Sequence, residues 1–200
     1  MRWYPRKTNP EVKDGIVQKK NRTDPSRGWR NWYQDTPLIE RQRPGAGHRH
    51  VLLKRDIERF IGLLADWKEL STELDAILLA PADPTCYGWH MPGIVAVCAW
   101  PRDLHRTWET DVVKANRELL ERLGVPVERI GQGLWKVQFR ESSVRAYQLL
   151  DVLLHELGHH HDRITTRSRR RVSRGEGYAY AYASRRTEEL WEAYADEFGW

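Results

Sequence analysis

The chain has 200 residues, including 10 Trp, 8 Tyr and 3 Phe, and its formal net charge is +5 at pH 7. The length suits one domain with a sizeable core, and the aromatic content excludes a wholly disordered chain. The charge is uneven, since residues 1–50 hold 12 Lys and Arg against 5 Asp and Glu and the remainder is slightly acidic.

The two cysteines, Cys86 and Cys98, are too few for the disulfide framework of a small secreted protein. No stretch of the sequence is long and apolar enough to cross a membrane. No apolar signal-peptide core follows the first residues either. We therefore expect a cytoplasmic protein that does not enter a membrane.

Residues 1–47 hold 5 of the 10 prolines and lack helical or alternating apolar periodicity. This composition predicts an extended or partly disordered basic arm, ahead of a domain formed by residues 48–200. Aromatic residues interleaved with arginine, as here, can stack on nucleic-acid bases; they are Trp3, Tyr4, Trp29, Trp32 and Tyr33. No nucleic-acid-binding motif accompanies them, so we favour docking on the domain or disorder.

Apolar spacing predicts the first elements of the domain. In residues 51–70 apolar side chains recur at helical intervals, which indicates an amphipathic helix. Residues 74–80 form an apolar run that ends at Pro81, and residues 93–100 form another, so both are predicted as strands. Cys98 in the second run is expected to be a small buried hydrophobic residue.

Residues 104–123 again show helical spacing, and Gly124 and Pro126 follow as stop signals, which predicts a second helix. Residues 134–139 are predicted as a short strand. Helices and strands mixed without regular strand–helix–strand units indicate an α+β fold, with a small and mostly antiparallel sheet packed on helices.

Residues 144–157 are apolar on several sides, which is typical of a buried helix. One polar line runs along this helix, formed at intervals of four, four and three residues by Asp151, His155, His159 and Asp162. Burying these groups unpaired would cost several kcal/mol, so the line predicts a bound partner such as a metal ion. His160 and His161 lie off the line and are expected at the surface or rim.

His155, Glu156 and His159 form the pattern H-E-x-x-H. Histidines four residues apart on a helix lie about 5–6 Å from each other and can bind one zinc ion. A glutamate beside the first histidine would lie next to a metal-bound water and take its proton. Asp151 or Asp162 would accept a hydrogen bond from the outer N–H of a ligand imidazole and orient it.

This pattern resembles the active-site helix of zincin metallopeptidases, and the sequence around it is similar to the gluzincin branch. The resemblance covers the last third of the chain. It implies a minimal zincin-like metallopeptidase domain, with Zn²⁺ as cofactor and the motif helix antiparallel to a C-terminal helix. It also implies a peptide or protein substrate lying along a sheet edge, which residues 93–100 or 134–139 would supply.

A catalytic zinc needs three protein ligands, and two later glutamates compete for the third place. Glu192 lies in a Glu-Ala-x-x-Asp pattern similar to that of gluzincins. Glu176 would return beside His159 if the motif helix ends near Ile164 and an antiparallel helix begins near Gly175. Glu192 would then lie about 24 Å further along. We therefore favour Glu176 and keep Glu192 as the alternative.

Other residues near the motif have candidate roles. Ala179 and Ala183 would let the two helices approach closely. Tyr178, Tyr180 and Tyr182 flank Glu176, and a phenol beside the metal can hydrogen-bond an oxyanion. Tyr178 and Tyr182 are the candidates for this role, although core packing is the more common role for such a tyrosine. His90 could line a cleft, although a lone histidine in a loop is more often structural.

Together these residues and the resemblance predict a zinc-dependent, peptidase-like hydrolase. His155, His159 and Glu176 would hold Zn²⁺, and Glu156 would activate water for attack on a peptide carbonyl. Two alternatives stay open: a hydrolase of non-peptide amides, and a non-catalytic or regulatory metal-site protein whose basic arm binds nucleic acid. The six arginines within residues 163–174 could select acidic substrates, but a solvated surface is the favoured interpretation.

Overall fold

The computed structural model describes residues 11–13, 16–18, 36–166 and 174–200. Within the predicted arm, β1 (Glu11–Lys13) and β2 (Ile16–Gln18) pair as an antiparallel hairpin. The five aromatic residues of the arm lie outside the described residues, as do four of the six arginines between 163 and 174. The nucleic-acid and acidic-substrate hypotheses concern these segments.

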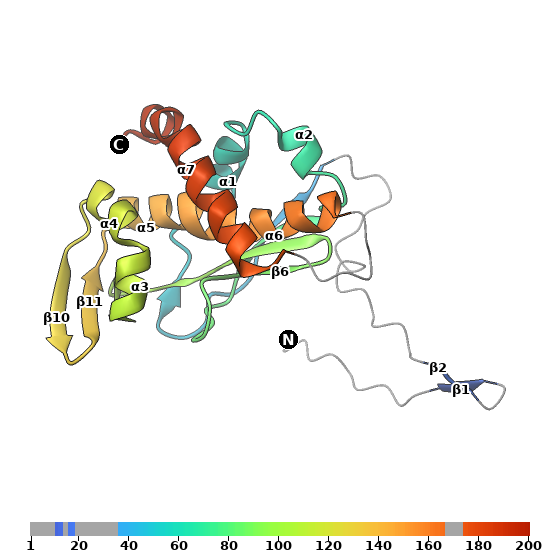
Figure 1. Cartoon of the computed structure of the whole chain (residues 1–200), viewed down its shortest axis with the longest axis horizontal. Helices are drawn as coiled ribbons and strands as arrows, with labels where there is room; N and C mark the ends of the chain where they lie inside the picture. Colours follow the sequence, from blue (N-terminus) through green and yellow to red (C-terminus); the bar gives the residue numbers. More distant parts are fainter. Residues whose placement is uncertain (1–10, 14–15, 19–35, 167–173) are drawn as a thin grey trace.

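The largest sheet among the described residues has four strands, and its strand β6 (Gly88–Met91) lies along α6 (Leu154–Thr165) in Figure 1. The strand order of this sheet is β3 (Leu38–Arg41), β5 (Ala76–Ala80), β7 (Ile94–Cys98) and β6. The β3–β5 and β5–β7 pairs are parallel, and only β6–β7 is antiparallel. The prediction of a mostly antiparallel sheet is therefore wrong here, although the predicted strands β5 and β7 are confirmed. Both are buried at every position, as parallel strands covered on both faces are.

β3 lies within the segment predicted as an arm, so the domain begins before residue 48. A second, three-stranded sheet is antiparallel, with the order β10 (Val127–Gly131), β11 (Leu134–Gln138) and β9 (His105–Glu109). A short pair joins β4 (His48–Arg49) to β8 (Trp100–Pro101).

The predicted helix over residues 104–123 is wrong in its first part, because β9 occupies residues 105–109 before α3 (Thr110–Ala115) and α4 (Arg117–Arg122). The tertiary pairing of β9 with β11 overrides the helical spacing. The predicted helix over residues 51–70 is present as two pieces, α1 (Lys54–Ile61) and α2 (Trp67–Leu70).

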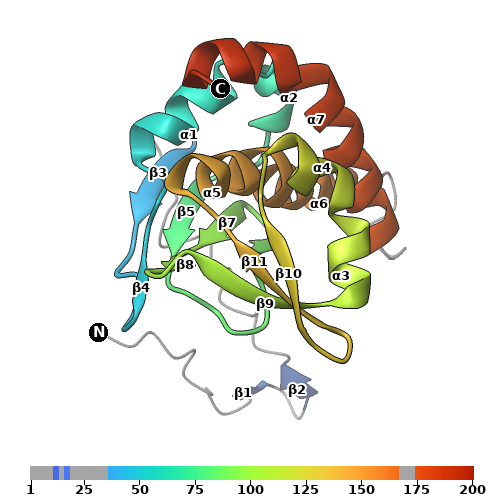
Figure 2. The same ribbon diagram turned by 90° about the vertical axis from the view of Figure 1, so that its left-hand side faces the viewer.

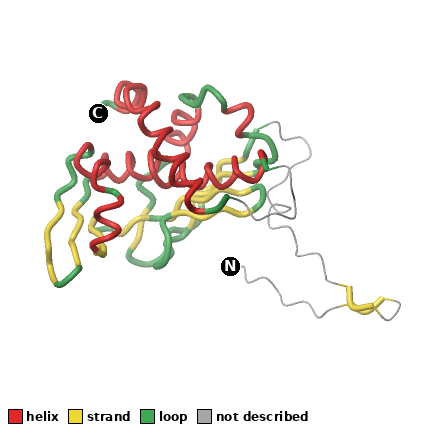
Figure 3. Tube along the Cα trace, viewed as in Figure 1, coloured by secondary structure: helices red, strands yellow, loops and turns green. Residues whose placement is uncertain are grey.

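The C-terminal part is helical, as predicted. α5 (Glu141–Tyr147), a π-helical segment η2 (Gln148–Leu153) and α6 (Leu154–Thr165) follow each other as one rod, and α7 (Glu176–Phe198) ends the chain. Figure 2 shows the rod between the sheets and a layer formed by α1, α2 and α7. Helices therefore gather on one side of the strands (Figure 3), in an α+β architecture.

The main core lies between the rod and the four-stranded sheet. Cys98 is 2% exposed on the opposite face of that sheet, which confirms its expected burial. None of the helices in the described part of the chain is both long and apolar enough to span a bilayer.

Candidate metal centre

The rod carries the H-E-x-x-H pattern into the interior of the domain. Its apolar residues pack in the main core and confirm the predicted buried helix; they are Val144, Leu149, Leu150, Val152, Leu153, Leu154 and Leu157. α6 lies against β6 and β7 on one side and against α7 on another. His155 and His159 therefore project from a helix that its neighbours hold in place.

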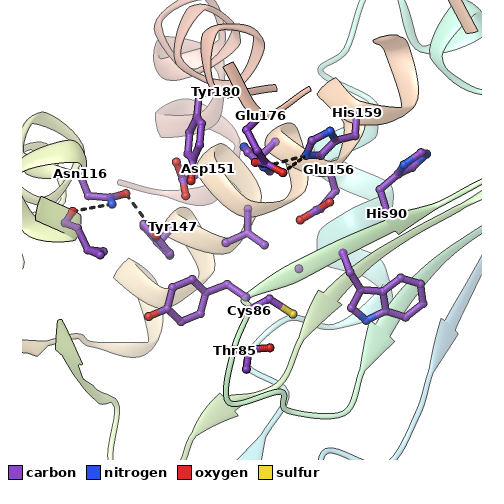
Figure 4. Close-up of a pocket in the computed structure, with 16 residues that line it drawn as sticks. Thr85, Cys86, His90, Asn116, Tyr147, Asp151, Glu156, His159, Glu176 and Tyr180 are labelled. Carbon is purple, nitrogen blue, oxygen red and sulfur yellow. Dashed lines mark hydrogen bonds and ion pairs between the residues drawn. The ribbon is translucent and has the colours of Figure 1, made fainter. Parts of the chain in front are cut away.

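Three side chains converge where α6 meets the start of α7 (Figure 4). The Nε2 atoms of His155 and His159 are 3.2 Å apart. The Glu176 carboxylate places Oε2 3.2 Å from His155 Nε2 and Oε1 3.4 Å from His159 Nε2. This cluster can hold a metal ion.

The chemistry and the spacing of these donors both suit zinc. Two imidazole nitrogens and one carboxylate are a common catalytic ligand set for this ion. With metal–ligand bonds of 2.0–2.1 Å, ligand atoms at the corners of a tetrahedron are about 3.3–3.4 Å apart. The 3.2 Å between the two Nε2 atoms is close to that value, and a different oxygen of the Glu176 carboxylate lies near each of them.

Glu176 lies beside the two histidines of the motif, whereas Glu192 is not part of the cluster. α6 ends at Thr165 and α7 begins at Glu176, so the antiparallel return places the first residue of α7 beside the motif. Glu192 is exposed on α7, 16 residues further along. Because a helix rises 1.5 Å per residue, Glu192 lies roughly 24 Å from Glu176 along the helix axis.

Glu156 is only 6% exposed and lines the same cavity as the three donors. Its pKa is raised to about 8, mainly by burial and also by the negative charges of Glu176 and Asp151. Gly88 on β6 makes the space for this side chain. A Cβ at residue 88 would lie 2.9 Å from Glu156 Cγ and 2.7 Å from Val152 Cγ1, both closer than van der Waals contact.

Asp151 lines the cavity, but it does not orient a ligand histidine as predicted. Its carboxylate is hydrogen-bonded by the Tyr147 hydroxyl. His155 Nδ1 is buried and has no hydrogen-bond partner among the described residues. Burial raises the pKa of Asp151 to about 6, although the bond from Tyr147 acts in the opposite direction.

Asp162 also has a different role from the predicted one. Its Oδ1 accepts hydrogen bonds from Arg174 Nε at 2.6 Å and from the Thr166 hydroxyl at 3.0 Å. Its Oδ2 accepts one from the backbone N–H of Gly175 at 3.3 Å. Asp162 therefore fixes the residue immediately before Glu176 and acts on the third donor through the backbone.

The tyrosines of α7 divide between two faces. Tyr178 contacts His161 Nδ1 at 2.7 Å, and Tyr182 stacks on the His161 ring, so neither lines the cavity. Tyr180 does line it, and its ring centroid lies 4.5 Å from that of His155. The prediction of Tyr178 and Tyr182 as oxyanion donors is therefore wrong in position, and Tyr180 is the phenol at the site.

Two further histidines lie near the site. His160 is fully buried, with Nε2 3.0 Å from the Thr72 carbonyl oxygen, so its expected surface position is wrong. His90 on β6 lines the cavity and stacks on His159, with ring centroids 6.2 Å apart. The pKa of His90 is lowered to about 3, mainly by burial and also by the neighbouring His160 and His159, so its imidazole is neutral at pH 7.

Both strands predicted as the substrate-binding edge are internal. β7 lies between β5 and β6, and β11 lies between β10 and β9. The edge strand beside the metal centre is β6, which contacts α6 and supplies Gly88, Trp89 and His90 to the cavity.

The cavity has a volume of about 630 Å³. Of the described residues that line it, Asp151, Glu156 and Glu176 carry carboxylates and none is Lys or Arg. The site is therefore acidic, although the chain as a whole is basic.

Comparison of the chain with protein-family models, with curated proteins and with solved structures finds no match. The basis for a function is therefore the site itself. It combines a donor triad, a buried carboxyl of raised pKa beside it, and a strand edge that has no neighbour among the described strands.

Proposed function

We propose that the protein is a zinc-dependent hydrolase of the zincin type that cleaves peptide bonds. The observation that carries the proposal is the convergence in one cavity of the His155, His159 and Glu176 donors with the carboxyl group of Glu156. A purely structural zinc site is closed by four protein ligands. Among the described residues, this cluster has three and opens into a cavity.

A zinc ion held by the triad supplies the Lewis acid that polarises a carbonyl group and makes water acidic near neutral pH. Glu156 takes a proton from the attacking water and returns it to the leaving amine. The raised pKa of Glu156 supports this role, because a general base works best when its pKa is near the working pH. Tyr180, which lines the cavity beside His155, donates a hydrogen bond to the carbonyl oxygen as it becomes negative.

The edge strand β6 favours a peptide over a non-peptide amide as the substrate. It pairs with β7 on one side and has no described strand on the other. An extended peptide can bind such an edge through main-chain hydrogen bonds. The two cavity residues that follow Gly88 on β6, Trp89 and His90, then contact the side chains of that peptide.

The test combines metal analysis with hydrolysis of a quenched fluorescent peptide library. Wild type should hold one zinc ion per chain and cleave peptides. Glu156→Gln should keep the zinc and lose at least roughly 100-fold in kcat, because proton transfer by a general base typically contributes that much. Glu176→Ala should lose zinc, whereas Glu192→Ala, a matched change on the same helix, should keep both zinc and activity.

Unaltered turnover in zinc-loaded Glu156→Gln would exclude the role of Glu156. Loss of zinc from Glu192→Ala but not from Glu176→Ala would exclude the ligand set.

A further inference from the structure

The cavity extends past the metal triad toward α3 and α5 (Figure 4). Its lining there comes from four elements and one junction, and it consists of Val112, Asn116, Tyr147, Asp151 and Tyr180. Asp151 precedes His155 by four residues on the same rod, so its carboxylate lies about one helical turn from the triad. A substrate bound at the metal therefore has this end of the cavity within reach of a neighbouring group.

Among the described residues, no positively charged group pairs with the carboxylate of Asp151. Glu176 contacts the two histidines, and Glu156 is the proposed general base. The carboxylate of Asp151 interacts only with the hydroxyl of Tyr147 among the described residues. A partly buried carboxylate loses hydration that one phenol replaces only in part, so it gains free energy when a cation binds beside it.

The aromatic ring of Tyr180 favours the same kind of ligand. Tyr180 is 60% exposed beside Asp151, whereas Tyr147 is 2% exposed and its ring packs against Trp108 and Phe139. Ammonium and guanidinium groups are attracted to the face of an exposed ring such as that of Tyr180. Asn116 Nδ2 donates to the Val112 carbonyl at 2.9 Å, and Asn116 Oδ1 lies 3.3 Å from the Tyr147 hydroxyl, so Asn116 is held in this wall.

We propose that Asp151, with the exposed ring of Tyr180, forms a specificity subsite for a cationic group of the peptide substrate close to the bond that is cleaved. The group is an ammonium or guanidinium, from a Lys or Arg side chain or from the N-terminal amine. This inference rests on the proposed function, since the subsite adjoins the metal centre. It predicts a protease selective for basic peptides, the opposite of the acidic selectivity that the arginine-rich segment suggested.

The test uses the zinc-loaded full chain at pH 8, where Asp151 is ionised because its pKa is about 6. Matched peptides carry Lys, Arg, norleucine or Glu at each position around the cleaved bond, with free or acetylated N-termini. Wild type should prefer Lys or Arg at one position, or a free N-terminus. Asp151→Asn should reduce kcat/KM for the preferred cationic peptide about ten-fold or more, as loss of an ion pair does. Cleavage of the norleucine peptide should change by less than about two-fold.

Asp103→Asn is the matched control, because this side chain is 61% exposed on a surface turn and does not line the cavity. It should leave the ratio between cationic and neutral peptides unchanged. Zinc content of each variant distinguishes a loss of selectivity from a loss of the metal site. Acetylation distinguishes the two sources of the cation, since it abolishes the preference only if the N-terminal amine is bound.

If wild type shows no preference for a cation at any position, the subsite proposal is wrong, but the proposed hydrolase function is unaffected. Equal losses for cationic and neutral peptides in Asp151→Asn would lead to the same conclusion. If no peptide is cleaved, the proposed hydrolase fails, and calorimetry then decides the subsite. Tighter binding of the Lys than the norleucine peptide, lost in Asp151→Asn, would support it, and equal binding would overturn it.

Discussion

Asp162 links the end of α6 to the start of α7 through a carboxylate that is only 1% exposed. Burial alone would raise its pKa, but the hydrogen bonds from Arg174, Thr166 and Gly175 outweigh burial and hold the pKa below its ordinary value. Because Glu176 follows Gly175 directly, this network also sets the position from which the third metal donor reaches the histidines.

Asp162→Asn should therefore destabilise the protein at pH 7 by about 1–3 kcal/mol, since it removes the charge from several hydrogen bonds. A carboxyl group whose folded pKa is depressed contributes stability above its unfolded pKa of about 3.9, and this stability is lost as pH falls through the folded value. The difference between wild type and variant should shrink between pH 5 and pH 3. Urea unfolding of both proteins, in a chelator, measures it.

Arg174→Gln is the companion variant, because it removes the strongest donor to the same carboxylate. It should reduce the stability at pH 7 in the same direction as Asp162→Asn. A difference between wild type and Asp162→Asn that stays constant from pH 7 to pH 3 would contradict the stabilising charge.

The residues of the site differ in how far the sequence could predict them. His155, Glu156 and His159 lie on one helix, so local spacing was sufficient to place them together. Tyr180 was passed over in favour of its neighbours Tyr178 and Tyr182, although it follows Glu176 by four residues and so shares its helix face. If Glu176 is the third metal donor, its separation of four residues from Tyr180 predicts that Tyr180 is the tyrosine beside the metal site. Tyr178 and Tyr182 are two residues to either side and face His161.

Among the elements, the edge strand β6 was missed for a different reason. Residues 88–91 were interpreted as part of a loop because glycine and proline surround them. Yet Pro92 and Gly93 separate Met91 from its partner Ile94, which is the two-residue spacing of a tight hairpin. The pairing partners of a strand depend on residues far away in sequence, so β7 and β11 could not be recognised as internal from their own composition.

The contact between α6 and α7 supports a prediction about Gly158. A Cβ added there would lie 3.0 Å from Ala179 Cα and 3.2 Å from the Ala179 carbonyl oxygen. Gly158→Ala should therefore force α7 away from α6, and this overpacking should destabilise the protein by about 1–3 kcal/mol. The better helix propensity of alanine should offset up to about 1 kcal/mol of that loss. Because α7 carries Glu176, zinc affinity should fall as well. Denaturant unfolding and competition with a zinc chelator measure the two effects.

Gly177→Ala is the matched control, since a Cβ at that position would meet nothing within 4 Å. It lies on α7, where alanine should be neutral or slightly stabilising. If both variants changed stability alike, close packing of the two helices would not be the cause.

At the scale of the whole molecule, the α+β class and the antiparallel helix pair at the C-terminus followed from sequence patterns. The parallel pairing of β3, β5 and β7 did not, because it joins segments from residues 38 to 98 through long connections. β3 was hidden in a segment dominated by proline and basic residues, and only its position beside β5 makes it part of the domain. Local composition therefore predicted where helices and strands lie better than it predicted which strands pair with each other.

The metal should also contribute to the stability of the whole domain, because its donors come from two helices that the chain joins only through residues 166–175. A ligand that binds only the folded state, at 1,000 times its dissociation constant, adds about 4 kcal/mol. For a domain of this size, each kcal/mol corresponds to roughly 2–4 °C. Removing zinc with a chelator should therefore lower the Tm of wild type by about 8–16 °C.

Scanning calorimetry with and without chelator measures this shift, and Glu176→Ala is the control because it lacks one donor. Its Tm should not respond to the chelator. Hydrogen exchange should then locate the effect: protection should fall at the start of α7 and in α6, while β5 and β7, buried at every position, keep theirs. Equal responses of wild type and Glu176→Ala would show that the chelator acts somewhere other than this triad.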